Sequence, residues 1–196
     1  MRLPGPTRHV LGFQYRADAD RFLNEFRERL GKFGELHPDK TRRIEFGRFA
    51  EQNRKRRGEG KPETFDFLGF KHISGKNRLG RFTVRRKTIR KRMGAKLRDI
   101  KQQLHERMHD PVRQTGQWLK SVVQGYFHYY AVPGNIDSLS VFRDRLTGQW
   151  WHTLRRRSQK RRLSWTRMLA LADRWLPRPR VLHPYPATRF AATYPR

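Results

Sequence analysis

The chain has 196 residues, which is enough for one domain or two small ones. Its 46 lysines and arginines against 17 acidic residues give a formal net charge of +29, so a compact fold repels itself unless a polyanion neutralises it. This balance favours nucleic acid as the partner over an anionic membrane surface. The chain has no cysteine, which excludes disulfides and cysteine-ligated zinc and fits a reducing, cytoplasmic location.

Aromatic residues make up 12% of the chain, and hydrophobic residues 35%, enough to bury a modest core. A disordered basic tail would lack these aromatics. The first residues contain no apolar segment of signal-peptide length, and no run approaches the ~20 apolar residues of a membrane span. We therefore expect a folded protein with no membrane partner.

The first half of the sequence predicts a small α/β part. Residues 1–15 are interrupted by proline and glycine and predict irregular structure. Apolar residues recur every three or four positions over 18–33, which predicts a helix. Residues 43–49 alternate apolar and polar side chains and predict a half-buried strand. The polar, glycine-containing residues 51–62 predict a mobile basic loop.

Two more strands are predicted, at 65–73 and 81–86. The residues between them, 74–80, are rich in turn formers and cations. The two strands can therefore pair as a hairpin with a long, basic end.

Residues 86–176 predict three or four amphipathic helices. The first helix has an apolar stripe of Ile89, Met93, Leu97, Ile100, Leu104 and Met108. The second has an apolar face of Leu119, Val122, Val123, Tyr126, Phe127 and Tyr130. The third has a stripe of Ile136, Leu139, Phe142, Leu146, Trp150 and Leu154. Gly94, inside the first helix, predicts a close approach to another segment.

Capping residues set the expected helix ends. Asp110 before Pro111 predicts the start of the second helix, and Asn135 is an expected N-cap of the third. Ser164 is an expected N-cap of a fourth helix, with Leu163 and Met168 placed as a hydrophobic staple. The tail from 177 to 196 contains proline at short intervals and predicts an extended chain.

These elements predict an α+β fold, with a small antiparallel β part followed by a helical domain of three or four helices. The expected segments are an irregular N-terminus, the α/β part, the helical domain and a proline-rich tail, at 1–15, 16–85, 86–176 and 177–196.

The stretch FDFLGFKHISGKNRLGRFTVRRKT at 65–88, followed by GYFHYYAVPGN at 125–135, resembles the C-terminal part of group II intron reverse transcriptase/maturase proteins. The resemblance covers about residues 13–190. It implies that LHPDKT at 36–41 is the fourth motif of the polymerase palm and that FLGF at 67–70 is the fifth, the primer-gripping hairpin. Residues from about 88 onward would be the thumb, or maturase, domain. In that family this domain binds the intron RNA and assists its splicing.

One part of the family pattern is missing. The metal-binding Tyr-Ala-Asp-Asp motif would precede Gly12, where this chain has MRLPGPTRHVL. Two-metal chemistry needs converging carboxylates, and the nearest acidic pair, Asp18 and Asp20, is better explained as charge at a helix N-terminus. We therefore expect no catalytic residue, no metal and no cofactor, and no polymerase activity from this chain alone.

Candidate RNA-binding residues fall into several groups. Lys40 matches the palm-motif lysine, and the backbone at Gly69 would let a nucleic-acid strand approach. A first basic group comprises Arg85, Arg86, Lys87, Arg90, Lys91, Arg92 and Lys96. A second comprises Arg155, Arg156, Arg157, Lys160, Arg161 and Arg162. Tyr126, His128 and Tyr129 are candidates for base stacking or for core hydrogen bonds.

Other polar and aromatic residues are weaker candidates. His105 and His109 are four apart on a helix but lack an acidic third ligand, so zinc is not expected. We expect Trp150, Trp165 and Trp175 to lie in the core and not to stack on bases. Trp151 is the exception, because it lies off the main stripe of its helix.

The expected partner is intron RNA, or an RNA/DNA duplex. The expected function is a maturase fragment that binds structured intron RNA and assists splicing. One alternative is the C-terminal half of a split or frameshifted reverse transcriptase, active only with an upstream fragment that supplies the aspartates. The other is a degenerate remnant without a role.

Overall fold

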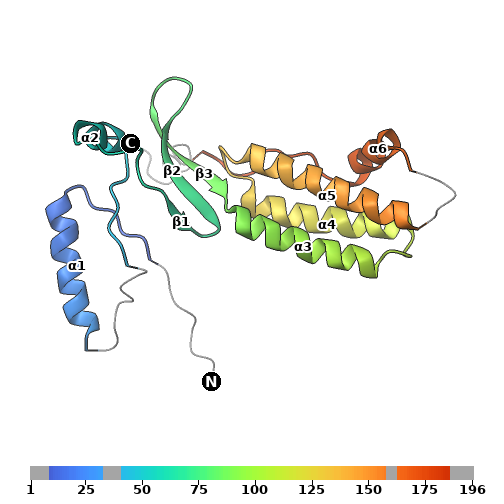
Figure 1. The fold of residues 1–196 in the computed structure, drawn as a ribbon, viewed down its shortest axis with the longest axis horizontal. Coiled ribbons are helices and arrows are strands. Elements are labelled where there is room, and N and C mark those ends of the chain that lie inside the picture. Colours follow the sequence, from blue (N-terminus) through green and yellow to red (C-terminus); the bar gives the residue numbers. More distant parts are fainter. Residues whose placement is uncertain (1–8, 33–40, 158–162, 186–196) are drawn as a thin grey trace. The chain divides into compact units, whose positions relative to one another are not determined.

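The computed structural model describes residues 9–32, 41–157 and 163–185. These contain six helices and a three-stranded antiparallel sheet, so the fold is α+β, as the sequence predicts (Figure 1). The chain divides into two compact units. Unit 1 holds residues up to 67 together with 73–83, and unit 2 holds 68–72 together with everything from 84 onward.

Unit 1 contains little buried surface. Helix α1 (Arg16–Leu30) confirms the first predicted helix but has no buried residue. Its apolar side carries a row of aromatic rings. The ring centroid of Phe22 lies 5.2 Å from that of Phe13 and 5.5 Å from that of Phe26. The predicted end of this helix, at 33, lies outside the described residues.

Two predictions in unit 1 are wrong. Residues 43–46 are irregular and are not a strand, and the expected loop at 51–62 contains helix α2 (Ala50–Arg56). Ala50 is buried, Glu51 lies in the first turn and three cations lie in the last turn, an order that the helix dipole stabilises. Gly58 follows with φ 71°, a conformation that suits glycine after a helix end.

The sheet has the strand order β1–β2–β3, with β1 at Phe65–Phe67, β2 at Phe70–Lys76 and β3 at Phe82–Thr88. The single strand predicted at 65–73 is therefore split in two. Leu68 and Gly69 form the turn between the parts, with φ of 46° and 82°. Two consecutive positive φ values are what a two-residue hairpin of type I′ requires.

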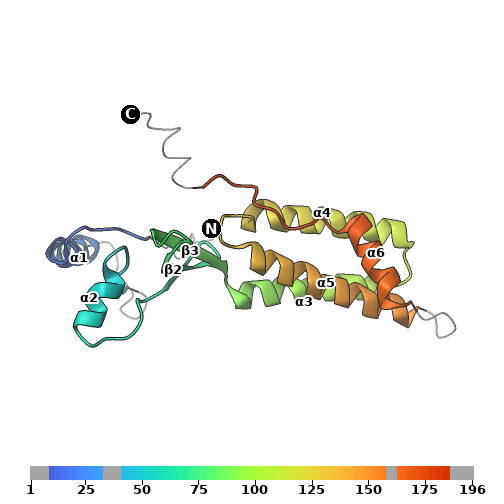
Figure 2. The same cartoon turned by 90° about the horizontal axis from the view of Figure 1, so that it is seen from above.

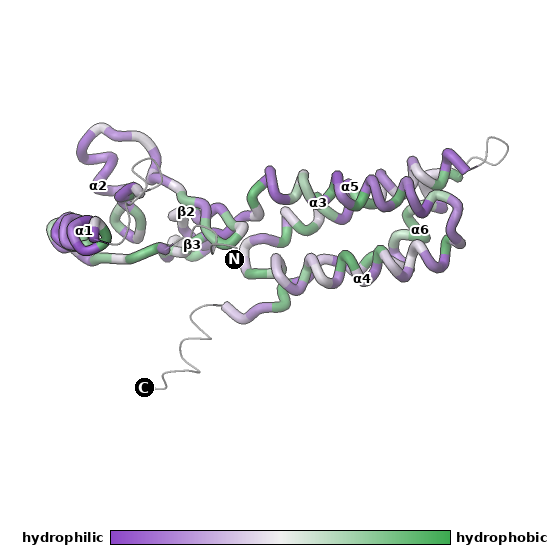
Figure 3. Tube along the Cα trace, turned by 90° about the horizontal axis from the view of Figure 1, so that it is seen from below, coloured by the Kyte–Doolittle hydropathy of each residue, from purple (hydrophilic) through white to green (hydrophobic). Residues whose placement is uncertain are grey.

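Unit 2 is built around four helices. Helices α3 (Arg90–Glu106), α4 (Val112–Tyr130) and α5 (Ile136–Arg156) run up, down and up, and α6 (Trp165–Trp175) crosses beside α4 and α5 (Figure 2). Most of the predicted stripe residues form the core, which includes the fully buried Ile100, Leu104, Leu119, Phe142 and Trp150. Ile136 is the exception on α5, because it is exposed. Figure 3 shows apolar and polar residues alternating along these helices, as amphipathic helices require.

The close approach between segments that was predicted at Gly94 is found instead at Gly116. A Cβ on Gly94 would meet only the Arg98 guanidinium, at 3.7 Å. A Cβ on Gly116 would lie 2.6 Å from the Trp175 ring, so α4 and α6 pack closely there.

Asn135 is not a side-chain cap of α5, contrary to expectation. It is fully buried, and its Oδ1 accepts from Thr88 N at 2.9 Å. Its Nδ2 donates to Thr88 Oγ1 and to Tyr130 O, both at 2.8 Å. Ser164 does cap α6, accepting from Arg167 N at 3.4 Å, and Met168 behind it is fully buried.

The chain after α6 is extended up to residue 185, as predicted, and it returns along α4. The backbone N–H of Leu182 donates to Ala131 O at 2.9 Å, and His183 Nε2 donates to His128 O at 2.6 Å. In the described residues no helix combines the length and the apolar composition needed to cross a bilayer.

Candidate nucleic-acid interface

The first basic group follows β3 into the start of α3. Arg85, Lys87, Arg90, Lys91 and Arg92 are exposed, as a phosphate-contacting surface requires. The other two members of the group differ, since one is partly buried and one is already paired.

Arg86 is half-buried, and burial lowers the pKa of its guanidinium. Lys96 Nζ lies 3.0 Å from Asp99 Oδ2, so part of its charge is neutralised within α3. The Lys96 ammonium also holds the pKa of the Asp99 carboxyl below its ordinary value. These two residues are therefore weaker phosphate ligands than their exposed neighbours.

Sequence reasoning missed a second set of basic side chains on α3. Arg98, Lys101 and His105 recur at three and four residues and share one edge of the helix, all exposed. Lys101 lies three residues after Arg98, and with Gln102 and Glu106 these side chains line a shallow open depression. The sequence carries the signal as a helical period of basic residues that continues beyond Lys96.

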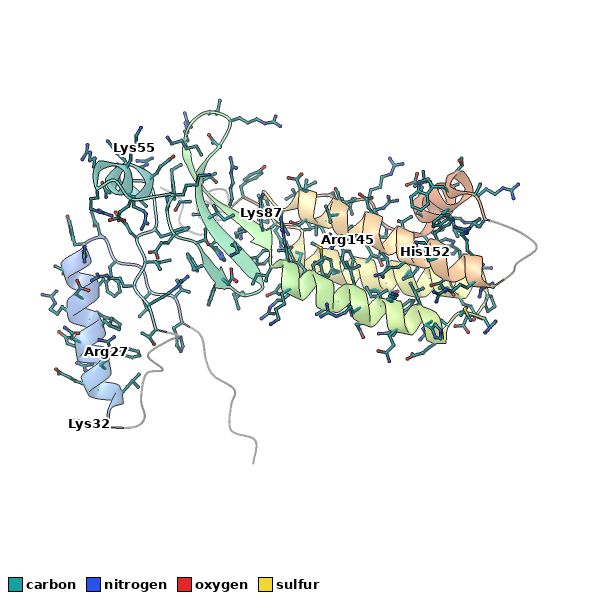
Figure 4. All side chains as sticks on the ribbon, in the orientation of Figure 1. Arg27, Lys32, Lys55, Lys87, Arg145 and His152 are labelled. Carbon is teal, nitrogen blue, oxygen red and sulfur yellow. The ribbon has the colours of Figure 1, made fainter. Side chains whose placement is uncertain are left out.

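Helix α5 packs against α3 and carries a similar set. Arg145, His152 and Arg156 are exposed and recur at seven and four residues, so they share one edge of α5. Figure 4 shows Arg145 and His152 along α5. We call these six side chains of α3 and α5 the α3/α5 rows.

The arginines and lysine of the α3/α5 rows have no carboxylate within 4.0 Å in the described part of the chain, in contrast to Arg143. The Arg143 guanidinium lies 2.7 Å from Asp173 Oδ1, and this hydrogen bond lowers the pKa of the Asp173 carboxyl. Helices α3 and α5 are in contact, so their exposed arginines and lysine add positive charge to the same helical unit.

The second predicted basic group has three described members with different roles. The Arg157 guanidinium donates to the carbonyls of Met108 and Asp110, so it fastens the α3–α4 connection to the end of α5. Arg155 lies over the Trp151 ring, 4.6 Å from its centroid, and Arg156 is exposed. We therefore correct the assignment of Arg157 from RNA contact to structure. Lys160, Arg161 and Arg162 lie outside the described residues, as does Lys40.

Tyr126 is not available for base stacking. It is 8% exposed, its ring stacks on Phe142 at 3.8 Å, and burial raises the pKa of its hydroxyl. The prediction left core and RNA contact open, and the core role is the one that its burial fits.

The two residues beside Tyr126 that were predicted to contact RNA are exposed. His128 is exposed, and its backbone carbonyl accepts from His183. Tyr129 is 50% exposed, and its hydroxyl donates to Leu68 O at 2.8 Å while its ring stacks on Phe70. Tyr129 therefore already anchors the β1–β2 turn to α4, with part of its ring left open to solvent.

The close backbone approach predicted at Gly69 is real, but its partner is a side chain. A Cβ there would lie 2.9 Å from the Tyr130 hydroxyl oxygen. Gly69 O also accepts from Ile89 N at 3.1 Å. The space assigned to a nucleic-acid strand is thus filled by α4, which corrects the prediction for Gly69.

Among the described residues, no group of three or more metal-ligating side chains converges. No family model, curated protein or solved structure matches this chain. The described residues of α3 and α5 present exposed basic side chains on the helical unit.

Proposed function

We propose that this chain binds structured RNA on its helical unit. The resemblance to group II intron maturases implies that the RNA is a group II intron and that binding assists its splicing. The observation that carries the proposal is the set of exposed lysines and arginines on α3 and α5 that have no acidic partner among the described residues, in a chain of formal net charge +29.

The expected mode of recognition follows from the shape of A-form RNA. Its base edges lie in a deep, narrow groove that helix side chains do not reach. Phosphate contacts from the first basic group and the α3/α5 rows would supply affinity, and the arrangement of helices in the RNA would supply most of the selectivity.

A salt titration tests the binding. If about eight phosphates are neutralised, affinity for intron RNA should fall about 10³–10⁵-fold between about 50 and 200 mM salt in filter binding. Affinity that does not change with salt would contradict the proposal.

A matched pair of variants tests the location. Arg98→Gln with Lys101→Gln should reduce the magnitude of the salt slope by about 1.5. Arg113→Gln with Lys120→Gln removes the same charge from exposed positions on α4 and should change the slope by less than about 0.5. Equal effects would mean that only the total charge matters and that α3 is not the contact surface.

Splicing provides the functional readout. The wild-type chain should accelerate splicing of a responsive transcript in a panel of group II introns at low Mg²⁺, and the α3 double variant should do so less. Primer extension by the chain alone should give no product, because this sequence lacks the Tyr-Ala-Asp-Asp carboxylates. Extension that begins only when an upstream palm fragment is added would favour the split-polymerase alternative.

A further inference from the structure

At the far end of unit 2, where α5 ends and α6 begins, an exposed indole is held in a fixed position. Trp165 is the first residue of α6 and is 45% exposed. Leu169, four residues on, is 44% exposed beside it on the same side of α6. A tryptophan this exposed needs an explanation, since burying a tryptophan stabilises a fold more than burying most other side chains.

The neighbour that orients Trp165 is Trp151. The two rings lie 5.4 Å apart at 80°, an edge-to-face pair. Trp151 is itself fixed, because its Nε1–H donates to Leu163 O at 3.0 Å. The position of the Trp165 ring is therefore fixed by contact with α5. A ligand that binds this ring does not have to pay the entropy cost of immobilising it.

The same cluster carries positive charge. Arg155 lies 4.6 Å from the Trp151 centroid, a cation–π contact that keeps a guanidinium within the aromatic cluster. An open aromatic ring beside an arginine is a combination that proteins use to hold an unpaired base and its phosphate.

We propose that Trp165 is a stacking platform for an unpaired nucleobase of the bound RNA, with Arg155 contacting an adjoining phosphate. This inference rests on the proposed RNA binding and adds a preference that phosphate contacts on α3 and α5 do not give. Base stacking needs a base that is free of its duplex, so the platform selects single-stranded nucleotides in loops, bulges or ends.

The test uses the full chain and three labelled probes in fluorescence anisotropy. The probes are a single-stranded oligouridylate of about 10 nucleotides, an abasic strand of the same length, and a blunt RNA duplex of about 20 base pairs. Trp165→Ala should weaken oligouridylate binding about 5- to 150-fold and leave duplex and abasic-strand binding within about twofold. Trp165→Tyr should keep most of the affinity, because it keeps a ring.

Leu169→Ala is the matched control, since it removes a similarly exposed apolar side chain from the same edge of α6 without removing a π face. It should leave all three affinities within about twofold. A loss equal to that of Trp165→Ala would indicate an apolar protein-docking patch and would overturn the platform. So would equal losses for oligouridylate and duplex, or unchanged oligouridylate binding by Trp165→Ala.

The two proposals fail in different ways. If the wild-type chain binds the duplex in a salt-dependent manner and Trp165→Ala has no selective effect, only the platform is wrong. If the wild-type chain binds none of the probes, both are wrong. Thermal melts monitored by circular dichroism confirm that each variant folds, which is expected because positions 165 and 169 are exposed and alanine favours helix.

Discussion

Asn135 joins three backbone segments of unit 2 through a single buried amide. The Oδ1 of Asn135 accepts from the Thr88 N–H. The Nδ2 of Asn135 donates both to Thr88 Oγ1 and to the carbonyl of Tyr130, the last residue of α4. Asn135→Ala leaves a buried donor without its acceptor, so we expect a loss of about 1–3 kcal/mol in the free energy of unfolding, measured by urea denaturation.

Gln124→Ala is the control for Asn135→Ala. Gln124 is exposed on α4, and its truncation should change the free energy of unfolding by no more than about 0.5 kcal/mol. Equal unfolding free energies for the two variants would mean that the Asn135 network contributes nothing.

At the scale of single residues, the sequence identified the right positions more often than the right roles. Asn135 stood out as a cap and Tyr126 as a candidate for either base stacking or the core, and both are buried. A helical period tells which side chains share a face, but the neighbouring element decides whether that face is covered. Thr88 and Phe142, the partners that decide these two cases, lie 47 and 16 residues away in the sequence.

Helix α4 carries two glycines in different surroundings, which makes a matched experiment. A Cβ at Gly116 would lie 2.6 Å from the Trp175 ring, while a Cβ at Gly125 meets nothing within 4 Å. Gly116→Ala should therefore cost about 1–3 kcal/mol through overpacking between α4 and α6. Gly125→Ala should gain about 0.5–1 kcal/mol, because alanine loses less backbone entropy in a helix.

Thermal or urea denaturation of the two glycine variants gives the readout, and the opposite signs are the discriminating result. If both variants gain stability, α4 and α6 do not pack as closely at Gly116 as the structure places them. If both lose stability, Gly125 has a contact that its open surroundings do not indicate.

Among the elements, the long helices were predictable and the short segments were not. Helices α3, α4 and α5 follow unbroken apolar stripes of four or more turns, which fixes both their type and their buried face. In unit 1 the segment at 43–49 alternates over too few residues to fix a strand, and none of the described strands pairs with it. The turn at Leu68–Gly69 was hidden because leucine rarely adopts a positive φ.

Over the whole molecule, the two units differ in how much apolar surface each buries. Among the described residues, unit 2 contains nearly all of the buried hydrophobic side chains, whereas in unit 1 only Ala50 is among them. The aromatic row of α1 stays partly exposed, with Phe13 at 42%. Burial stabilises a folded unit, so the free energy of opening should differ between the units by several kcal/mol.

Hydrogen exchange followed by mass spectrometry measures that difference directly. Amides of α1 form helical hydrogen bonds but have no buried side chains above them, so local opening exposes little new apolar surface and should be frequent. Amides at the centres of α4 and α5, beside the fully buried Leu119, Val123 and Leu146, should exchange only through opening of the whole helical unit. Peptides from α1 should therefore exchange at least about 100-fold faster than peptides from α4, which corresponds to about 2.7 kcal/mol of opening free energy. Equal protection of α1 and α4 would contradict this prediction, because it would mean that the exposed face of α1 is covered in solution. Repeating the exchange across a range of protein concentrations would show whether a second copy of the chain covers that face.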